Sequence, residues 1–147
     1  MKWVTRQRAK VDRVACPWLI LNFIDPQAEF IFAPADQVRE VAEREGAIPF
    51  DAPGVKLGHH HGHCSFESIL AEYQLTDPAL QKLARIVHGA DIPADLGMTP
   101  QSAGLRAIAE GWDALGWPDQ RRLEIGFVLY DGLYAWCRAQ IGSRESS

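Results

Sequence analysis

Helix start and stop signals in the C-terminal two-thirds of the chain constrain its fold more than any other feature. Asp77 and Pro78 form an N-cap followed by a proline in the first turn, and Gly89 lies near the end of the same segment. Ser65 is a second N-cap candidate, and Gly142 is predicted to end the last helix. The predicted helices cover residues 65–75, 77–91, 99–115 and 119–142. This part of the chain is therefore expected to be mainly helical.

The first third of the chain contains the β-rich segments. The residue patterns there predict strands at 3–6 and 29–33 and helices at 12–25 and 34–46. Asp12 is a plausible N-cap of the first helix, Pro26 ends it, and Gly46 ends the second. The fold class is α+β, with a small sheet from the N-terminal third packed against a mainly helical C-terminal two-thirds. Residues 1–142 are predicted to form a single domain and residues 143–147 a disordered tail.

Composition limits the functional classes. The chain has 147 residues, of which 47% are hydrophobic and 23% charged, as in ordinary globular domains. Its net charge of -4 lacks the basic character of a nucleic-acid-binding domain, so direct DNA binding is not expected. No segment has the apolar length of a signal peptide or a membrane span, which predicts a cytoplasmic protein without membrane association. The 3 cysteines are widely spaced, which argues against a disulfide framework.

The segment GVKLGHHHGHCSFE holds four of the 5 histidines, and imidazole is the commonest metal ligand. Consecutive side chains of an extended segment point to opposite sides, so these histidines cannot all face one ion. His60, His61 and His63 are equally well explained as a polar loop. His59 is better placed, because it ends the extended segment VKLGH. Cys64 precedes a helix start and is interpreted either as a half-buried small residue or as a thiol near a helix N-terminus.

His88 and Asp91 lie three residues apart at the end of a predicted helix, on one face. This spacing suits two metal ligands, or one ligand and the carboxylate that orients it. The alternative is a histidine that interacts with the helix dipole at the C-terminus. The sequence leaves both interpretations open.

The last predicted helix carries Glu124, Asp131 and Tyr134 on one stripe of a very apolar segment, so we expect this helix to be largely buried. A carboxylate on it must be paired or coordinated, and a salt bridge between Asp131 and Arg13 is the leading structural interpretation. Arg6 and Arg13 belong to a basic N-terminal cluster. The arginine fork suits tetrahedral oxyanions as well as carboxylates, which makes both residues candidates for anion binding.

Six segments in order resemble one known family. They are WVTRQRAKVDRVACPWLI, FIDPQAEFIF, IPFDAPGVKLGH, CSFESIL, LARIVHGAD and LYDGLYAWCR. Together they resemble the chromate-resistance family, of the ChrB C-terminal domain type, from about Trp3 to Arg138. Longer members carry a preceding DNA-binding regulatory domain, so this chain resembles a stand-alone version. The family motifs match at Arg6, Arg13, Cys16, Trp18, His59, Phe66, Glu67, His88, Asp91, Tyr130, Asp131 and Tyr134.

The resemblance implies a role in chromate resistance. Together with the histidines, carboxylates and arginines above, it leads to the hypothesis of a metal- and oxyanion-binding accessory protein of chromate or heavy-metal resistance. Arg6 and Arg13 would bind chromate or another small oxyanion. The expected ligands of a divalent ion, with zinc as the first choice, are His59, His88, Asp91 and Glu67. The residues expected to orient these ligands are Glu124, Asp131, Tyr134 and Cys64. A homodimer is compatible with this interpretation.

Two alternatives remain open at this stage. A small metalloenzyme could use the same histidines and carboxylates with an open coordination position. A pure interaction domain would instead join Arg13, Asp131 and His88 in a buried polar network.

Overall fold

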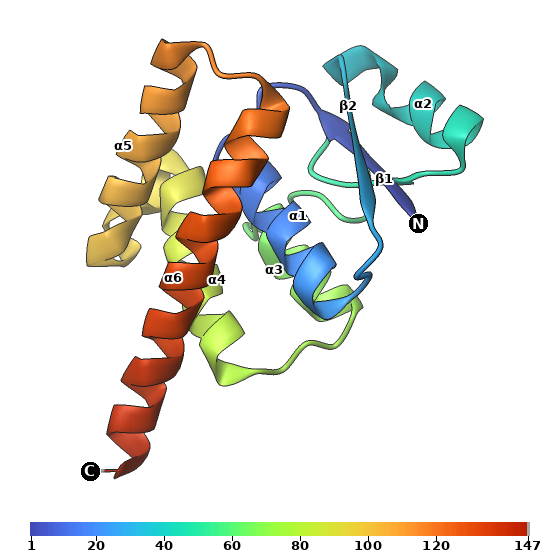
Figure 1. Ribbon diagram of the computed structural model, residues 1–147. Coiled ribbons are helices and arrows are strands. Elements are labelled where there is room, and N and C mark those ends of the chain that lie inside the picture. Colours follow the sequence, from blue (N-terminus) through green and yellow to red (C-terminus); the bar gives the residue numbers. More distant parts are fainter. Residues whose placement is uncertain (147) are drawn as a thin grey trace.

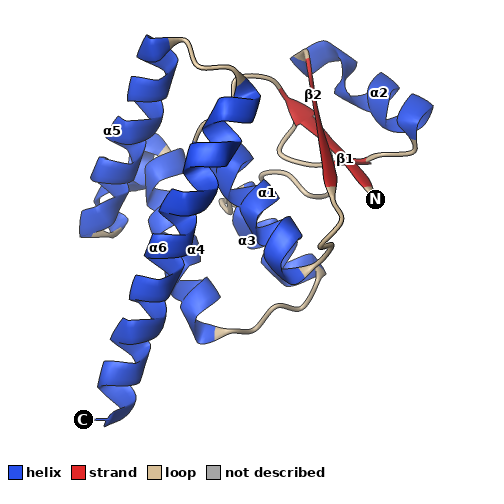
Figure 2. Cartoon of the chain, viewed as in Figure 1, coloured by secondary structure: helices blue, strands red, loops and turns tan. Residues whose placement is uncertain are grey.

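A small parallel sheet and a larger group of helices make up the protein, which confirms the α+β prediction (Figures 1 and 2). The computed structural model describes the backbone of residues 1–146 and the side chains of residues 1–142. The elements are β1 (Lys2–Arg6), α1 (Val11–Phe23), β2 (Glu29–Ala33), η1 (Ala35–Gln37), α2 (Val38–Glu45), β3 (Ile48–Pro49), α3 (Ser65–Glu72), α4 (Pro78–Asp91), η2 (Pro93–Met98), α5 (Pro100–Leu115) and α6 (Asp119–Ser146). Both η elements are 3₁₀ helices.

The sheet has the order β2-β1-β3, and both neighbours run parallel to β1. Two parallel strands need a crossover connection, and α1 supplies it between β1 and β2. The central strand is buried on both faces: Trp3 belongs to the main core, and Val4 packs with Val38 and Val41 of α2. Figure 1 shows α2 on one side of the sheet and the other helices on the opposite side. This arrangement places the end of β1 and the start of α1 next to the helical part.

The predicted helix starts are confirmed for α4 and α5, where Asp77 and Thr99 cap the first turn and a proline follows each of them. The N-cap of α3 lies one residue earlier than predicted, because Cys64 and not Ser65 occupies the cap position. The assignment of Asp12 as the N-cap of α1 was wrong: Asp12 lies inside the first turn of α1, and Lys10 occupies the cap position. The carboxylate of Asp12 serves a different helix, as described below.

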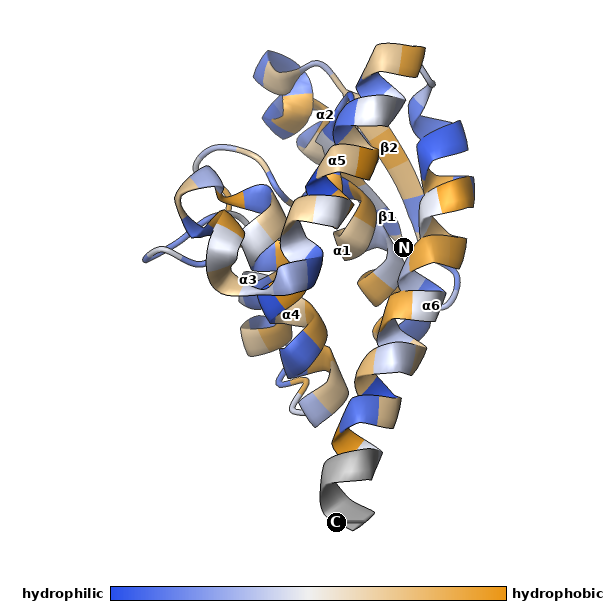
Figure 3. Cartoon of the chain, turned by 90° about the vertical axis from the view of Figure 1, so that its left-hand side faces the viewer, coloured by the Kyte–Doolittle hydropathy of each residue, from blue (hydrophilic) through white to orange (hydrophobic). Residues whose placement is uncertain are grey.

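Helix α6 is less buried than its apolar sequence predicts. Its buried side forms one narrow face against α1 and α4, with Arg122, Gly126, Tyr130 and Cys137. Val128 is 70% exposed and Trp136 36%, and Figure 3 shows apolar residues at several positions along the helix. The helix continues past Gly142 to Ser146, and the predicted tail at 143–147 lies outside the described side chains. None of the helices among the described residues is long and apolar enough to cross a membrane.

Candidate functional site

A buried carboxylate from α1 anchors the N-terminus of α3. Asp12 is 1% exposed, and its two oxygens accept the backbone N–H groups of Ser65 at 2.7 Å and Phe66 at 3.0 Å. The first N–H groups of a helix have no partner within the helix, and its positive dipole end favours a negative charge. Asp12 therefore holds α1 against α3 and lies beside the loop that precedes α3.

Asp51 is a second buried carboxylate, on the turn after β3, with a left-handed φ of 46°. Its Oδ1 accepts the hydroxyl of Ser65 at 2.6 Å. Its Oδ2 lies 3.1 Å from Nε of Arg13 and 3.5 Å from Nη2 of Arg6. Nε of Arg6 also donates to the carbonyl oxygen of Asp51 at 2.8 Å. The two arginines expected to bind an anion thus converge on one carboxylate.

His59 is the point at which three carboxylates meet. Its Nε2 lies 3.0 Å from Oδ2 of Asp91, 3.4 Å from Oδ2 of Asp12 and 3.5 Å from Oδ1 of Asp51. These carboxylates come from α4, α1 and the turn after β3. One N–H group donates well to one acceptor, so a single proton cannot satisfy all three carboxylates. The geometry is that of several carboxylate oxygens around one cationic position.

The charges of this cluster shift the pKa values of its members. Contacts with Asp12, Asp51 and Asp91 raise the pKa of His59 to about 12, although burial alone would lower it. Burial, followed by the charges of Asp91 and Asp51, raises the pKa of Asp12 to about 7. Burial would also raise the pKa of Asp51, but contacts with His59, Ser65 and the arginines keep it below its ordinary value. The cluster therefore holds a protonated imidazole among three acids.

A second cluster surrounds His88 in the last turn of α4. Its Nδ1 lies 2.5 Å from Oε1 of Glu67, and its Nε2 lies 2.6 Å from Oδ2 of Asp95. One donor atom each of Cys64, Glu67 and His88 lies within 4.8 Å of the others. Oε2 of Glu67 also faces Nδ1 of His63 at 3.5 Å. Burial would lower the pKa of His88, but Asp95 and Glu67 raise it.

The residues expected to form one metal site are thus divided between two clusters. His59 lies with Asp91, and His88 lies with Glu67 and Cys64. Although His88 and Asp91 lie about one turn apart on α4, Asp91 contacts His59, whereas His88 contacts Glu67 and Asp95. We name these groups the His59 cluster (Asp12, Asp51, His59, Asp91) and the His88 cluster (Cys64, Glu67, His88, Asp95).

The polar residues of α6 have partners outside both clusters. Asp131 accepts the indole N–H of Trp18 at 2.8 Å, and the hydroxyl of Tyr134 donates to Asp77. Glu124 is exposed, and among the described residues it takes part in no ion pair. The expected salt bridge between Asp131 and Arg13 was wrong, because Asp51 attracts Arg13.

Sequence reasoning missed Asp12, Asp51 and Asp95 as members of these clusters. Asp12 does carry a signal, since this acid lies two residues before the buried segment VACPW, on a helix with few polar positions. Asp51 lies in a turn with a left-handed backbone, and a turn position is itself an ordinary explanation for an aspartate. Nothing local in the sequence distinguishes Asp95 from an ordinary surface acid.

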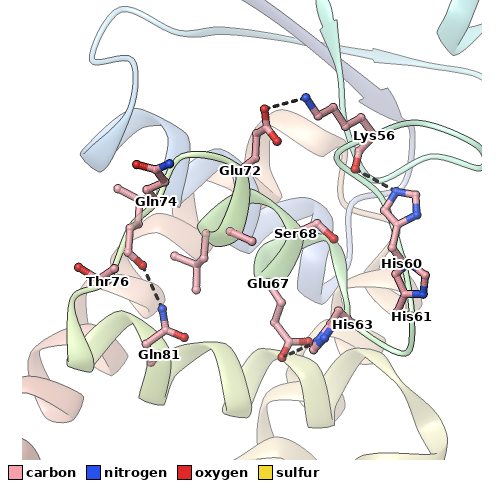
Figure 4. Close-up of a pocket in the computed structure, with 13 residues that line it drawn as sticks. Lys56, His60, His61, His63, Glu67, Ser68, Glu72, Gln74, Thr76 and Gln81 are labelled. Atoms are coloured by element: carbon pink, nitrogen blue, oxygen red, sulfur yellow. Dashed lines mark hydrogen bonds and ion pairs between the residues drawn. The ribbon is translucent and has the colours of Figure 1, made fainter.

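The loop at His60 to His63 forms a tight turn beside a wide groove. The backbones of His60 and His63 bond to each other in both directions, and Nε2 of His60 contacts the carbonyl oxygens of Val55 and Lys56. A groove of about 690 Å³ opens next to this turn and reaches Glu67 (Figure 4). Smaller cavities border the His59 cluster on two sides, one of about 320 Å³ and one of about 200 Å³.

Comparison with known proteins identifies the family. The family model described as "ChrB, C-terminal domain" matches residues 3–137. Protein ChrB of Cupriavidus metallidurans is 38% identical over 137 residues, which cover 90% of this chain and 40% of the relative. The chain thus spans well under half the length of that relative, and no solved structure matches it. The chain belongs to the chromate-resistance ChrB family, as a domain of the C-terminal type.

Proposed function

We propose that this domain binds a divalent metal ion at Asp12, His59 and Asp91 and an oxyanion beside it, and that it contributes to chromate resistance in this way. The observation that carries the proposal is the convergence of three carboxylates on Nε2 of His59 at 3.0, 3.4 and 3.5 Å. Membership in the chromate-resistance ChrB family supports chromate as the oxyanion.

The donor atoms suit an ion of the size of zinc. Zinc binds histidine nitrogen and carboxylate oxygen at about 2.0–2.2 Å, which separates neighbouring ligand atoms of a tetrahedral site by roughly 3.3 Å. The contacts of His59 with Asp12 and Asp91 bracket this separation at 3.4 and 3.0 Å. Asp51 would be a fourth donor, or would keep its present role of holding the arginines. A bound ion would supply a positive charge that neutralises carboxylates and attracts an oxyanion.

The charges explain why metal and anion binding would be linked. Asp12, Asp51 and Asp91 surround the protonated ring of His59, and Asp51 also contacts the guanidiniums of Arg6 and Arg13. With all three acids ionised, these charges cancel, so the cluster offers little attraction to a dianion. A divalent ion in place of the proton on His59 leaves an excess of positive charge. We therefore infer that the oxyanion binds after the metal.

The cavities on either side of the His59 cluster provide room for the oxyanion. One of about 320 Å³ is lined by Arg6, Asp51 and His59, and the side chain of Arg6 is 30% exposed. The other, of about 200 Å³, is lined by Arg13 and Asp91 together with further basic residues. Arginine binds tetrahedral oxyanions through two parallel N–H groups. Both arginines lie close enough to the proposed metal position to contact an anion that the metal attracts.

Elemental analysis of protein purified without a polyhistidine tag tests the metal half of the proposal. We expect bound zinc, or zinc uptake after removal of the native ion, and loss of one equivalent in His59→Gln. His61→Gln is the matched control, because His61 is an exposed histidine of the same loop and should leave this equivalent unchanged. Equal zinc content in wild type and His59→Gln would contradict the proposal.

Calorimetric titration with chromate tests the anion half. The zinc-loaded protein should bind chromate and the metal-free protein should bind it at least tenfold more weakly. Arg13→Met should weaken binding by a similar factor, because one buried charge-assisted contact contributes about 1.5–3 kcal/mol. Arg44→Met, at a highly exposed arginine, is the control. Chromate binding that survives Arg13→Met, or that does not depend on zinc, would refute this part.

A metalloenzyme is the second candidate function. The side chain of His59 is 49% exposed and lines the cavity of about 320 Å³, so an ion held by three protein atoms would keep a position open toward solvent. X-ray absorption spectroscopy of the zinc-loaded protein distinguishes the two candidates. Three protein ligands and one water would favour an enzyme, whereas four protein ligands would favour a binding site.

A further inference from the structure

The His88 cluster lies apart from the proposed ion at His59 and has a different donor set. Cys64 and Glu67 are three residues apart at the N-terminus of α3, and His88 comes from the last turn of the neighbouring α4. The sulfur of Cys64, a carboxylate oxygen of Glu67 and a nitrogen of His88 lie within 4.8 Å of one another. Cys64 is fully buried, and the side chain of His88 is 7% exposed. Thiolate, imidazole and carboxylate together form a common zinc ligand set.

The identity of residue 64 is informative because of its position. Cys64 occupies the N-cap of α3, and Glu67 accepts its backbone N–H at 2.9 Å, which forms a capping box. Serine, threonine, aspartate and asparagine are the preferred N-cap residues, because their oxygens accept backbone N–H groups more strongly than sulfur does. A cysteine at this position is therefore a poor choice for capping alone, and its sulfur points into the cluster with Glu67 and His88.

The contacts of His88 match a metal ligand and its orienting carboxylate. Histidines that bind metals usually donate their second ring N–H to a carboxylate, which fixes the ring. Nε2 of His88 faces Asp95 at 2.6 Å in this way, and Nδ1 points toward Glu67 and Cys64. An ion bound here would take the place of the proton that Nδ1 of His88 shares with Glu67.

A fourth donor and an entry route are present at the same place. Nδ1 of His63 lies 3.5 Å from Oε2 of Glu67, and the side chain of His63 is 61% exposed (Figure 4). The groove of about 690 Å³ is lined by both residues, so solvent reaches the carboxylate. His63 is held by the tight turn that begins at His60, which limits how far it can move away.

We propose that Cys64, Glu67 and His88 bind a second divalent ion, with His63 as the fourth ligand and Asp95 orienting His88. Coordination replaces the S–H bond of Cys64 with a metal–sulfur bond, and this proton and the one shared by His88 and Glu67 both leave to the solvent. A thiolate ligand favours zinc and other ions with high sulfur affinity, whereas the oxygen-rich His59 cluster accepts harder ions as well. The two sites are therefore distinguishable by their ligands.

Cobalt titration of the tag-free protein tests this proposal, because a cobalt–thiolate bond gives an intense charge-transfer band in the near ultraviolet. We expect the band in wild type and its complete loss in Cys64→Ser. Serine is a preferred N-cap residue, so this variant should keep α3 intact. Cys16→Ser and Cys137→Ser are the matched controls, since both cysteines are buried outside the His88 cluster, and both variants should keep the band. His63→Gln should weaken cobalt binding about tenfold or more.

The same experiment tests the two proposed metal sites independently of each other. His59→Gln should keep the charge-transfer band and lose one equivalent of metal, whereas Cys64→Ser should lose the band and keep the other equivalent. A band that persists in Cys64→Ser, that disappears in Cys16→Ser, or that is absent from cobalt-loaded wild type would overturn the proposal. Should Cys64→Ser not fold, circular dichroism would show it, and loss of the band in His88→Gln would then replace that test.

Discussion

Substitution of Asp12 by asparagine should stabilise the metal-free protein near neutral pH and abolish metal binding at the His59 cluster. The pKa of Asp12 rises from its ordinary value of 3.8 to about 7, first because of burial and then because of the charges of Asp91 and Asp51. Asparagine resembles the protonated acid: it is neutral and keeps one oxygen to accept a backbone N–H from the start of α3. It cannot supply the anionic oxygen that a metal ion needs.

The magnitude follows from proton linkage. A carboxyl group with a higher pKa in the folded than in the unfolded chain binds more protons when folded, so its ionisation lowers the free energy of unfolding as the pH rises. The slope is about 1.4 kcal/mol per pH unit between the two pKa values. From pH ~4.5 to pH ~6.5, Asp12 should therefore remove about 2.5 kcal/mol of stability in wild type and none in Asp12→Asn. His59 stays protonated in wild type over this range, because its pKa is raised to about 12, and in Asp12→Asn the contacts with Asp51 and Asp91 still raise its pKa.

Urea unfolding of both proteins in the presence of a chelator measures this effect. The difference in unfolding free energy between Asp12→Asn and wild type should change by about 2.5 kcal/mol across the range, in favour of the variant. In a Cys64→Ser background, which removes the second proposed ion, addition of zinc should then stabilise the protein with Asp12 by about 2.7 kcal/mol at a hundredfold excess over its Kd and leave the protein with Asp12→Asn unchanged. Parallel pH profiles would refute the raised pKa of Asp12, and equal stabilisation by zinc would refute its role as a ligand.

Four further variants test packing and charge. Gly126→Ala should destabilise the protein by about 1–3 kcal/mol in urea unfolding, because a Cβ there would lie 2.3 Å from Cγ1 of Val14. Gly132→Ala is the control and should be neutral or stabilising, because a Cβ there would have no atom within 4 Å. Arg122→Met should cost about 3–5 kcal/mol by the same assay, since its buried guanidinium donates to a carboxylate and two backbone carbonyls. The pKa of His88 is raised above its ordinary value of 6.5, so the stabilisation by its charge is fully present below pH 6.5 and is lost as the pH rises through the pKa of the folded state. In unfolding experiments with a chelator, His88→Gln should therefore be more destabilised relative to wild type at acidic than at alkaline pH.

Local signals made the helix boundaries predictable from the sequence, whereas the burial of the helices depends on long-range packing and could not be predicted. Asp77 with Pro78 marks the start of α4 within two residues, because capping depends only on neighbouring backbone groups. The burial of α6 depends on which faces α1 and α4 offer to it, and periodicity carries no such information. Val128 therefore remains 70% exposed on a helix that the sequence predicted to be buried.

The histidines and Asp91 could be selected from the sequence, but their grouping could not. The contact between His59 and Asp91 joins a loop to the end of a helix across 32 positions, and no local pattern encodes it. Asp12 was hidden because a helix-capping role explained it well. In the structure it caps a helix 53 positions away, and this places its charge next to His59. The main error of the sequence interpretation was thus to accept the local capping role of Asp12, which left its long-range contacts out of the predicted site.

The dependence of metal affinity on pH follows from the protons that an ion must displace. Both His59, with a pKa of about 12, and Asp12, with a pKa of about 7, carry protons below neutral pH. Below pH ~7, zinc binding at the His59 cluster displaces two protons, so the affinity should rise by about a hundredfold per pH unit. Above pH ~7, zinc displaces only the proton of His59, so the affinity should rise by about tenfold per pH unit. Competition titrations with a chelating dye at several pH values measure this change in slope, and Asp12→Glu is an informative comparison if it still binds zinc. An affinity independent of pH would mean that the ion does not replace the proton of His59, because ligands that are already deprotonated release nothing on binding.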